Sequence, residues 1–414
     1  MTDFYQHGSI ATLHRLSTPD LDALEQSLSR YTRRRPIALV IPALYSDLVA
    51  APMREILKTL RDVPYLQMLV VSLDQADEEH FRLTREILID LPFDVRVVWN
   101  HGPRVQGCLK ELSDNKLYAG EPGKGRASWM AFGYVLANEE ICTIALHDSD
   151  IRTYSREFLA RLCYPVANPH FDFEFCKGFY ARYADRMYGR VTRLLIFPLL
   201  RSLREIMHYP VYLNYLSSFR YPLAGEIAMA VDLARSIRIP GDWGLEVGML
   251  GEVYRTLAIK RVCQSELCER YDHKHQDLSP EDPDAGLHRM SVDIMKNLLR
   301  TMAAEGITID EGLLQTVVAM YVKRAEDTVN SYAADAVING LEFDRHAEET
   351  AVHTFAESIQ RAGELFFDDP LGVPLIPNWN RITSALPDFL GRLRAAVEED
   401  QLELVAATAG SVSE

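Results

Sequence analysis

The sequence lacks the marks of a membrane protein and of a general nucleic-acid binder. No stretch approaches the ~20 apolar residues that a membrane-spanning helix needs, and the opening MTDFYQHGSIATLHR has no apolar core of a signal peptide. Basic residues are in the minority, with 44 Lys and Arg against 59 Asp and Glu and a net charge of −15. Such an acidic chain has little basic surface with which to release the counterions of a nucleic acid. We therefore expect a cytoplasmic protein that binds neither membrane nor nucleic acid.

Cysteine is scarce as well. The 414 residues include six cysteines and no Cys-x-x-Cys pair, which argues against a disulfide scaffold and against a thiolate zinc site. Hydrophobic residues make up 48% and charged residues 25% of the chain. These ordinary values argue against a disordered or fibrous protein. At ~100 to 200 residues per domain, the length predicts two or three folded units.

From Ile37 onwards, short apolar runs alternate with longer amphipathic stretches. This alternation is typical of a mostly parallel sheet that is covered by helices. The expected strands are 37–41, 66–73, 95–99 and 141–146. The expected crossover helices are 53–61, 78–90 and 126–137. The pattern predicts a Rossmann-like α/β fold, in which ligands bind beyond the carboxyl ends of the strands.

The chain divides into three expected parts. Residues 1–35 are expected to form an N-terminal helical extension, and residues 36–283 to form the α/β domain. Residues 284–414 read as a mainly helical C-terminal region. Helices expected at 290–304 and 311–328 carry apolar faces, which makes this region a candidate homodimer interface.

Two carboxylates follow the buried strand at 141–146. Asp148 and Asp150 are two residues apart, so in extended backbone their side chains point the same way and lie ~6.6 Å apart. Mg²⁺ and Mn²⁺ favour such oxygen ligands and bind through one or two carboxylates together with substrate phosphates. The pair therefore indicates a cation that holds a diphosphate, although a solvated acidic turn would show the same pattern.

A glycine-rich loop at 121–126 precedes an expected helix. Its glycines allow close approach of a ligand, Lys124 supplies a positive charge, and the start of a helix favours anions. The loop lacks the complete G-x-x-x-x-G-K-[ST] spacing, so ATP hydrolysis is a poor fit. It predicts a phosphate site, with an ordinary surface turn as the alternative.

Further downstream, His273 and His275 face the same side of an extended segment and could complete the shell of a cation. Glu226 follows Gly225, and Glu246 lies two residues after Gly244; near a glycine, a carboxylate could hold sugar hydroxyls or cap a helix. The chain shows no Ser/His/Asp or Cys/His spacing that would support a covalent hydrolase.

Taken together and in order, these segments resemble the glucosyl-3-phosphoglycerate synthases, a family of retaining glycosyltransferases. The resemblance spans roughly residues 37–278 and depends on the series of motifs rather than on any one of them. The matching segments are Pro42-Ala43-Leu44, Gly123-Lys124-Gly125, Asp148-Ser149-Asp150, Gly189-Arg190-Val191-Thr192, Pro222-Leu223-Ala224-Gly225-Glu226 and Gly244-Leu245-Glu246-Val247-Gly248.

By this resemblance the fold would be glycosyltransferase-A, an α/β sheet with helices on both faces, followed by the C-terminal helical region. The protein would be a metal-dependent hexosyltransferase that moves glucose from UDP- or GDP-glucose to D-3-phosphoglycerate, with Mg²⁺ or Mn²⁺ as cofactor. The product, glucosyl-3-phosphoglycerate, would be a precursor of the compatible solute glucosylglycerate. Residues 36–150 would bind the nucleotide sugar and residues 151–283 the acceptor.

The resemblance also implies roles for individual residues. The donor would be bound by Pro42, Ala43, Leu44, Ser72, Lys124, Asp148, Ser149, Leu223, Trp243 and Glu246. The acceptor would be bound by Gly189, Arg190, Val191, Thr192 and His275. Asp150 and His273 would hold the cation. The catalytic residues would be Lys124, Asp148, Asp150 and Glu246.

Three departures from the family pattern keep alternatives open. Tyr45-Ser46-Asp47 replaces the family's Asn-Glu, Ala224 replaces a glycine, and His275 replaces an asparagine. The first leaves UDP and GDP open, and the others leave room for a different sugar or acceptor. The alternatives are a transferase of the mannosylglycerate synthase kind that uses GDP-mannose or free glycerate, and a non-catalytic binder of nucleotide sugars. A sugar-phosphate nucleotidyltransferase is a poorer fit, because no glycine-rich triphosphate loop follows the first strand.

Overall fold

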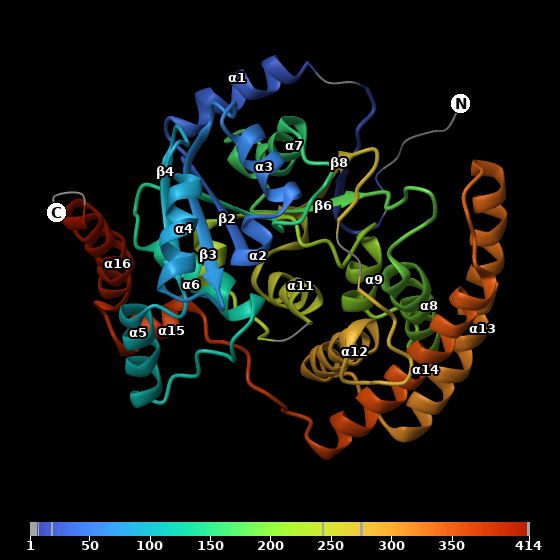
Figure 1. Ribbon diagram of the computed structural model, residues 1–414. Coiled ribbons are helices and arrows are strands. Elements are labelled where there is room, and N and C mark those ends of the chain that lie inside the picture. Colours follow the sequence, from blue (N-terminus) through green and yellow to red (C-terminus); the bar gives the residue numbers. More distant parts are fainter. Residues whose placement is uncertain (1–5, 7, 18–19, 242–243, 274–275, 412–414) are drawn as a thin grey trace.

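The computed structural model describes residues 6, 8–17, 20–241, 244–273 and 276–411. In these ranges the centre of the molecule is an eight-stranded sheet (Figure 1) with the order β1-β8-β6-β7-β5-β2-β3-β4. Strand β7 runs antiparallel to both of its neighbours, and all the other pairs are parallel. The strands are β1 (Ala11–Leu13), β2 (Ile37–Leu44), β3 (Leu66–Asp74), β4 (Asp94–Trp99), β5 (Thr143–Leu146), β6 (Phe175–Tyr180), β7 (Ile227–Ala230) and β8 (Val262–Cys268).

Helices cover both faces of the sheet, as the sequence predicted. Alternate residues of β2 point to opposite sides, so Leu39 and Ile41 join one apolar core while Ala38 and Val40 join the other. The first core includes α1 (Leu21–Thr32), α3 (Ala51–Leu60), α4 (Glu78–Leu88) and α7 (Arg156–Ala167). The second includes α5 (Pro103–Asp114), α6 (Lys124–Leu136), the π-helical turn η1 (Val191–Ile196), α8 (Phe197–Ile206), α9 (Val211–Ser218), α10 (Val231–Ser236) and α11 (Leu245–Thr256). The short α2 (Tyr45–Leu48) and the 3₁₀ turn η2 (Ile259–Arg261) complete this part.

The sequence predicted seven of the elements between residues 37 and 146, and it missed α2 and α5. The four predicted strands are β2 to β5, and the three predicted crossover helices are α3, α4 and α6. Strand β1 was missed, because three residues are too few to show a period in a segment that was expected to be helical. It extends the sheet by pairing with β8, with Ala11 opposite Cys263. The N-terminal segment therefore contributes a strand as well as helix α1.

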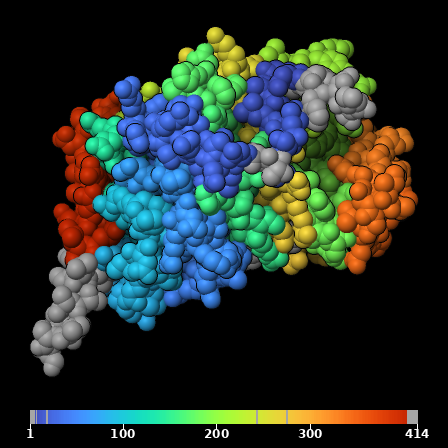
Figure 2. All heavy atoms as spheres, turned by 90° about the horizontal axis from the view of Figure 1, so that it is seen from above, coloured from blue at the N-terminus to red at the C-terminus, as the bar shows by residue number. Residues whose placement is uncertain are grey.

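The C-terminal region is helical, as predicted. It consists of α12 (Gly286–Ala304), α13 (Glu311–Asn339), α14 (Arg345–Asp368), α15 (Trp379–Ala385) and α16 (Phe389–Ser411). Helices α13 and α14 lie at the opposite end of the molecule from α16 (Figure 2, orange and red). The chain between them returns to the sheet, where Trp379 stacks on Trp129 of α6 with ring centroids 4.1 Å apart. The three-part division stays a prediction.

The described ranges contain no helix that is long and apolar enough to cross a bilayer. All six cysteines lie in these ranges and are unpaired. This agrees with the absence of a disulfide scaffold that the sequence predicted.

Candidate active site

A cavity of about 1770 Å³ opens beyond the carboxyl ends of β2 and β5. Pro42, Ala43 and Leu44 lie at the end of β2, and Asp148 and Asp150 follow β5. These strands are parallel neighbours, so their carboxyl ends meet at one edge of the sheet. The cavity is therefore located where the α/β pattern predicted a ligand. Its wall contains most of the predicted site residues: Pro42, Ala43, Leu44, Lys124, Asp148, Ser149, Asp150, Gly189, Arg190, Val191, Thr192, Leu223, Glu246 and His273.

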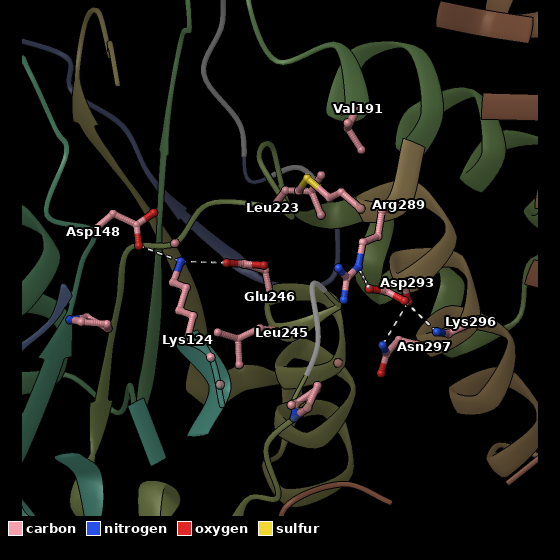
Figure 3. A pocket seen from close by; sticks show the side chains of 18 of the residues that line it. Lys124, Asp148, Val191, Leu223, Leu245, Glu246, Arg289, Asp293, Lys296 and Asn297 are labelled. Atoms are coloured by element: carbon pink, nitrogen blue, oxygen red, sulfur yellow. Dashed lines mark hydrogen bonds and ion pairs between the residues drawn. The ribbon is translucent and has the colours of Figure 1, made fainter. Parts of the chain in front are cut away.

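Lys124 joins two carboxylates from distant parts of the chain (Figure 3). Its Nζ lies 2.6 Å from Asp148 Oδ1 and 3.2 Å from Glu246 Oε1, and Glu246 belongs to the first turn of α11. Burial lowers the pKa of Lys124, but the attraction of the two carboxylates outweighs this effect and raises the pKa above its ordinary value. Burial alone would raise the pKa of Asp148, but the neighbouring Lys124 lowers it below its ordinary value. The site thus holds a fixed cation between two anions.

Two glycines allow this approach of distant segments. A Cβ on Gly225 would lie 2.8 Å from Asp148 Oδ2, and one on Gly125 would lie 2.3 Å from the carbonyl oxygen of Pro240. Any larger residue would move the carboxylate in the first case and the start of α6 in the second. Gly125 and Gly225 therefore allow close contacts that a residue with a side chain would prevent.

Asp150 and His273 lie side by side at the wall of the cavity, with His273 Nδ1 3.5 Å from Asp150 Oδ2. A carboxylate and an imidazole suit Mg²⁺ or Mn²⁺ when a substrate and water supply the other ligands. No group of three or more candidate metal ligands occurs among the described residues. The oxygen atoms of a bound diphosphate suit the remaining places around such a cation.

His147 holds the start of the segment that follows β5 through two hydrogen bonds. It is fully buried, with Nδ1 2.9 Å from the carbonyl oxygen of Asp148 and Nε2 3.1 Å from Tyr154 Oη. Burial lowers its pKa to about 4. The neutral ring therefore donates from Nδ1 to the Asp148 carbonyl and accepts at Nε2 from Tyr154. The sequence analysis missed this role, although His147 precedes the acidic pair directly.

A buried polar layer lies beneath the Pro-Leu-Ala-Gly-Glu turn. Glu226 is fully buried and accepts hydrogen bonds of 2.6 Å from the hydroxyls of Tyr180 and Tyr271. Lys177 of β6 donates to the carbonyl oxygen of Ala224 at 2.6 Å, and burial lowers its pKa to about 8. Glu226 does not line the cavity. It neither caps a helix nor reaches a sugar site here, so both sequence-based interpretations of this residue are wrong.

Ser72, one of the predicted donor-binding residues, is buried away from the cavity. Ser72 does not line the cavity, because its fully buried Oγ donates to the Ala127 carbonyl at 2.7 Å and accepts from Asn100. The prediction that the Ser72 side chain lines the nucleotide pocket is therefore wrong. Trp243 and His275 lie outside the described residues.

The wall opposite Lys124 comes from two further segments. Arg190 is half-buried, and Thr192 is buried with no hydrogen-bond partner for its Oγ1 among the described residues. Helix α12 adds Asp293, whose carboxylate lies 2.6 Å from Lys296 Nζ (Figure 3). Helix α12 was predicted as a helix, but no motif in it indicated a position at the cavity.

The chain is similar to proteins of known activity over nearly its whole length. No protein-family model matches the chain. The chain is 44% identical to a glucosyl-3-phosphoglycerate synthase of Persephonella marina over 400 residues, which cover 97% of this chain and 99% of that protein. It is 38% identical to a glucosyl-3-phosphoglycerate synthase of Methanococcoides burtonii over 406 residues, covering 97% and 98% of the two chains.

Among solved structures, the fold is similar to that of glucosyl-3-phosphoglycerate synthase from Mycobacterium tuberculosis in complex with Mn²⁺, UDP-glucose and phosphoglyceric acid. The TM-score is 0.52 at 24% identity, and the match covers 73% of this chain and 89% of the other.

Proposed function

Because this chain belongs to the family of glucosyl-3-phosphoglycerate synthases, we propose that it transfers glucose from a nucleoside-diphosphate glucose to 3-phosphoglycerate. Its fold is that of the family, a glycosyltransferase-A sheet with an added C-terminal helical region. The observation that carries the proposal is the joint placement of Lys124, Asp148 and Glu246 beside Asp150 and His273 in one cavity. Donor diphosphate, cation and sugar each have a matching group there.

The donor side supplies charge where the reaction releases it. Breaking the bond between the sugar and the diphosphate leaves negative charge on the leaving group. Lys124, which its neighbours keep protonated, lies at the start of α6 and stabilises that charge. Asp150 and His273 would hold Mg²⁺ or Mn²⁺, which supplies further positive charge to the leaving diphosphate. Glu246 is mostly buried and can accept hydrogen bonds from the sugar hydroxyls.

The acceptor side suits a small phosphorylated acid. Arg190 lines the cavity, and a guanidinium binds phosphate or carboxylate through two parallel hydrogen bonds. Thr192 Oγ1 is buried and has no hydrogen-bond partner among the described residues, so it can donate a hydrogen bond to a ligand. Two groups of this kind can grip the two anionic ends of 3-phosphoglycerate and so orient its hydroxyl toward the sugar.

The proposal is tested by release of nucleoside diphosphate from UDP- and GDP-linked glucose and mannose, with 3-phosphoglycerate or glycerate as acceptor. We expect release from a glucose donor only when both 3-phosphoglycerate and a divalent cation are present. Equal release with free glycerate would favour the glycerate-using alternative. Donor binding without release would make the protein a binder, and the proposal would then fail.

We also propose that the protein acts in the cytoplasm and that it is a homodimer. The dimer is proposed on the sequence argument given for its C-terminal helices. Sedimentation at micromolar concentration tests the oligomeric state, and a species with the mass of one chain, 47.1 kDa, would contradict the dimer.

A further inference from the structure

One carboxylate of the C-terminal region reaches the acceptor side of the cavity. Glu348 lies in the first turn of α14 and is only 4% exposed. Its Oε1 accepts a hydrogen bond from Arg190 Nε at 2.7 Å, and its Oε2 lies 2.8 Å from an Nη of Arg193. Residues 158 positions apart in the chain are thus joined at the predicted acceptor arginine.

Arg193 extends this contact to the backbone before Arg190. Its Nε donates to the Tyr188 carbonyl at 2.9 Å and its Nη2 to the Met187 carbonyl at 3.3 Å. The guanidinium also lies over the ring of Tyr332 in α13, 4.7 Å from the ring centroid. Arg193 therefore connects the segment that leads to Gly189 and Arg190 to helices α13 and α14.

The connection between α13 and α14 holds the same segment at a second point. The backbone N–H of Glu342 donates to the Asp185 carbonyl at 2.8 Å, and the Glu342 carboxylate lies 2.6 Å from Arg186. Arg186, Tyr188 and Gly189 all line the cavity. One wall of the acceptor site is therefore backed by the α13–α14 hairpin.

The charges of this group favour an anion. One carboxylate, Glu348, is shared by two arginines, which leaves a positive charge in excess. Glu348 occupies Nε of Arg190, whereas the two Nη groups of Arg190 have no hydrogen-bond partner in the described part of the chain. These two donors form a planar fork of the kind that binds phosphate or carboxylate. The contact with Glu348 therefore fixes the orientation of the Arg190 guanidinium and leaves its two Nη groups available to a ligand.

We propose that Glu348 is a positioning residue for the anionic acceptor, acting through Arg190 and Arg193. This inference rests on the proposed function, because it assigns Arg190 to the acceptor. It also gives the C-terminal helices a part in acceptor recognition. A fixed guanidinium binds a phosphorylated acid better than one that must first be ordered, because less side-chain entropy is lost on binding.

The test compares Glu348→Gln with a matched variant of another ion pair. Glu348→Gln keeps the size of the side chain but removes the charge that both arginines share. Glu205 of α8 pairs with Arg324 of α13, so Glu205→Gln also weakens a contact to the C-terminal helices, yet neither residue lines the cavity. The Michaelis constants for donor and 3-phosphoglycerate, kcat and thermal unfolding are measured for both variants with the full chain.

We expect Glu348→Gln to raise the Michaelis constant for 3-phosphoglycerate about tenfold, with that for the donor unchanged. Glu205→Gln should leave both constants within about twofold of wild type. Glu348→Asp keeps the charge on a shorter side chain and should recover part of the loss, and it serves as the variant if Glu348→Gln does not fold. An acceptor constant that is unchanged or lowered would overturn the proposal, because removal of a nearby negative charge alone strengthens anion binding.

A double-mutant cycle shows whether Glu348 acts through Arg190. Arg190→Ala should itself raise the Michaelis constant for 3-phosphoglycerate, and adding Glu348→Gln to it should raise the constant little further. Additive effects would mean that Glu348 acts elsewhere, and the proposal would fail. Wild-type turnover in the same assay keeps this failure separate from a failure of the proposed function, which would appear as no release with 3-phosphoglycerate at all.

Discussion

At the scale of single residues, the site depends on charges that are paired before any substrate binds. Lys124 lies between Asp148 and Glu246, and Asp150 lies beside His273. Such preorganised charges cost little reorganisation when a leaving group develops charge. Loss of one charge leaves its half-buried neighbours with less compensation, which is why single substitutions here should have large effects on turnover.

Asp150→Ala removes one of the two protein groups that would hold the cation. Substitution of residues that only support a metal ligand costs about 10- to 100-fold, so loss of the ligand itself should lower kcat/KM by at least about 100-fold. Release of nucleoside diphosphate across a Mg²⁺ titration measures this. If the variant retained most of its activity at low Mg²⁺, the assignment of Asp150 to the metal would be wrong.

His147 predicts a particular dependence of stability on pH. Burial lowers its pKa from an ordinary value of 6.5 to about 4 in the folded protein. Between these values the unfolded chain binds a proton that the folded chain does not, so stability falls as the pH drops from 6.5 to 4, by up to about 3 kcal/mol from this residue.

His147→Asn isolates this contribution, because the amide can still donate to the Asp148 carbonyl but does not titrate. We expect urea unfolding to show a smaller loss of stability between pH 6.5 and pH 4 in the variant than in wild type. Parallel pH profiles for the two proteins would show that His147 does not titrate as its burial implies.

At the scale of elements, close packing of backbone segments sets the position of the charges. Helix α6 begins at Lys124, one residue before Gly125, which lies against the Pro240 carbonyl. The first turn of α11 brings Glu246 to the same lysine. Helix α6 can approach the Pro240 carbonyl this closely because Gly125 has no side chain.

Gly125→Ala should push α6 away from Pro240 and displace Lys124. Overpacking of this kind costs about 1 to 3 kcal/mol of stability, and the displaced lysine should lower turnover as well. Gly107→Ala in α5 is the control, because its Cβ would meet nothing within 4 Å. It should stabilise the protein by about 0.5 to 1 kcal/mol with activity unchanged. Similar effects of the two changes in unfolding and activity assays would contradict this account of Gly125.

At the scale of the whole molecule, the C-terminal helices contact the rest of the chain at two ends: α13 and α14 pack against α8, η1 and α12, and α16 packs against β4, α5 and α6. Helices α13 and α14 lie behind the acceptor wall, and the chain then crosses to the other end, where Trp379 is buried against Trp129 (Figures 1 and 2). Trp129 Nε1 also donates to the Pro377 carbonyl at 2.9 Å. Contacts at both ends couple the folding of the C-terminal region to that of the sheet.

Trp379→Ala tests this coupling. Removal of a fully buried tryptophan should cost about 3 to 5 kcal/mol. We expect the near-ultraviolet signal of the sheet core and the helical signal to shift together to lower urea concentration. Loss of helical signal well before the core signal would instead indicate a C-terminal region that folds by itself.

The sequence alone determined the features that depend on local pattern. Short apolar runs located β2 and β5 and set Asp148 and Asp150 at a strand end, and amphipathic stretches located α3, α4 and α6. The series of short motifs indicated the family. These features could be predicted because neighbours in the chain determine them.

The tertiary structure decided what depends on residues far apart in the chain. It inserted β7 antiparallel between β6 and β5, buried the Ser72 side chain beneath α6, enclosed Glu226 between two tyrosines, and brought Glu348 to Arg190. No local period encodes these contacts, because each arises only when the topology folds one segment onto another. The acceptor side of the site, which the C-terminal helices back, is therefore a property of the whole fold.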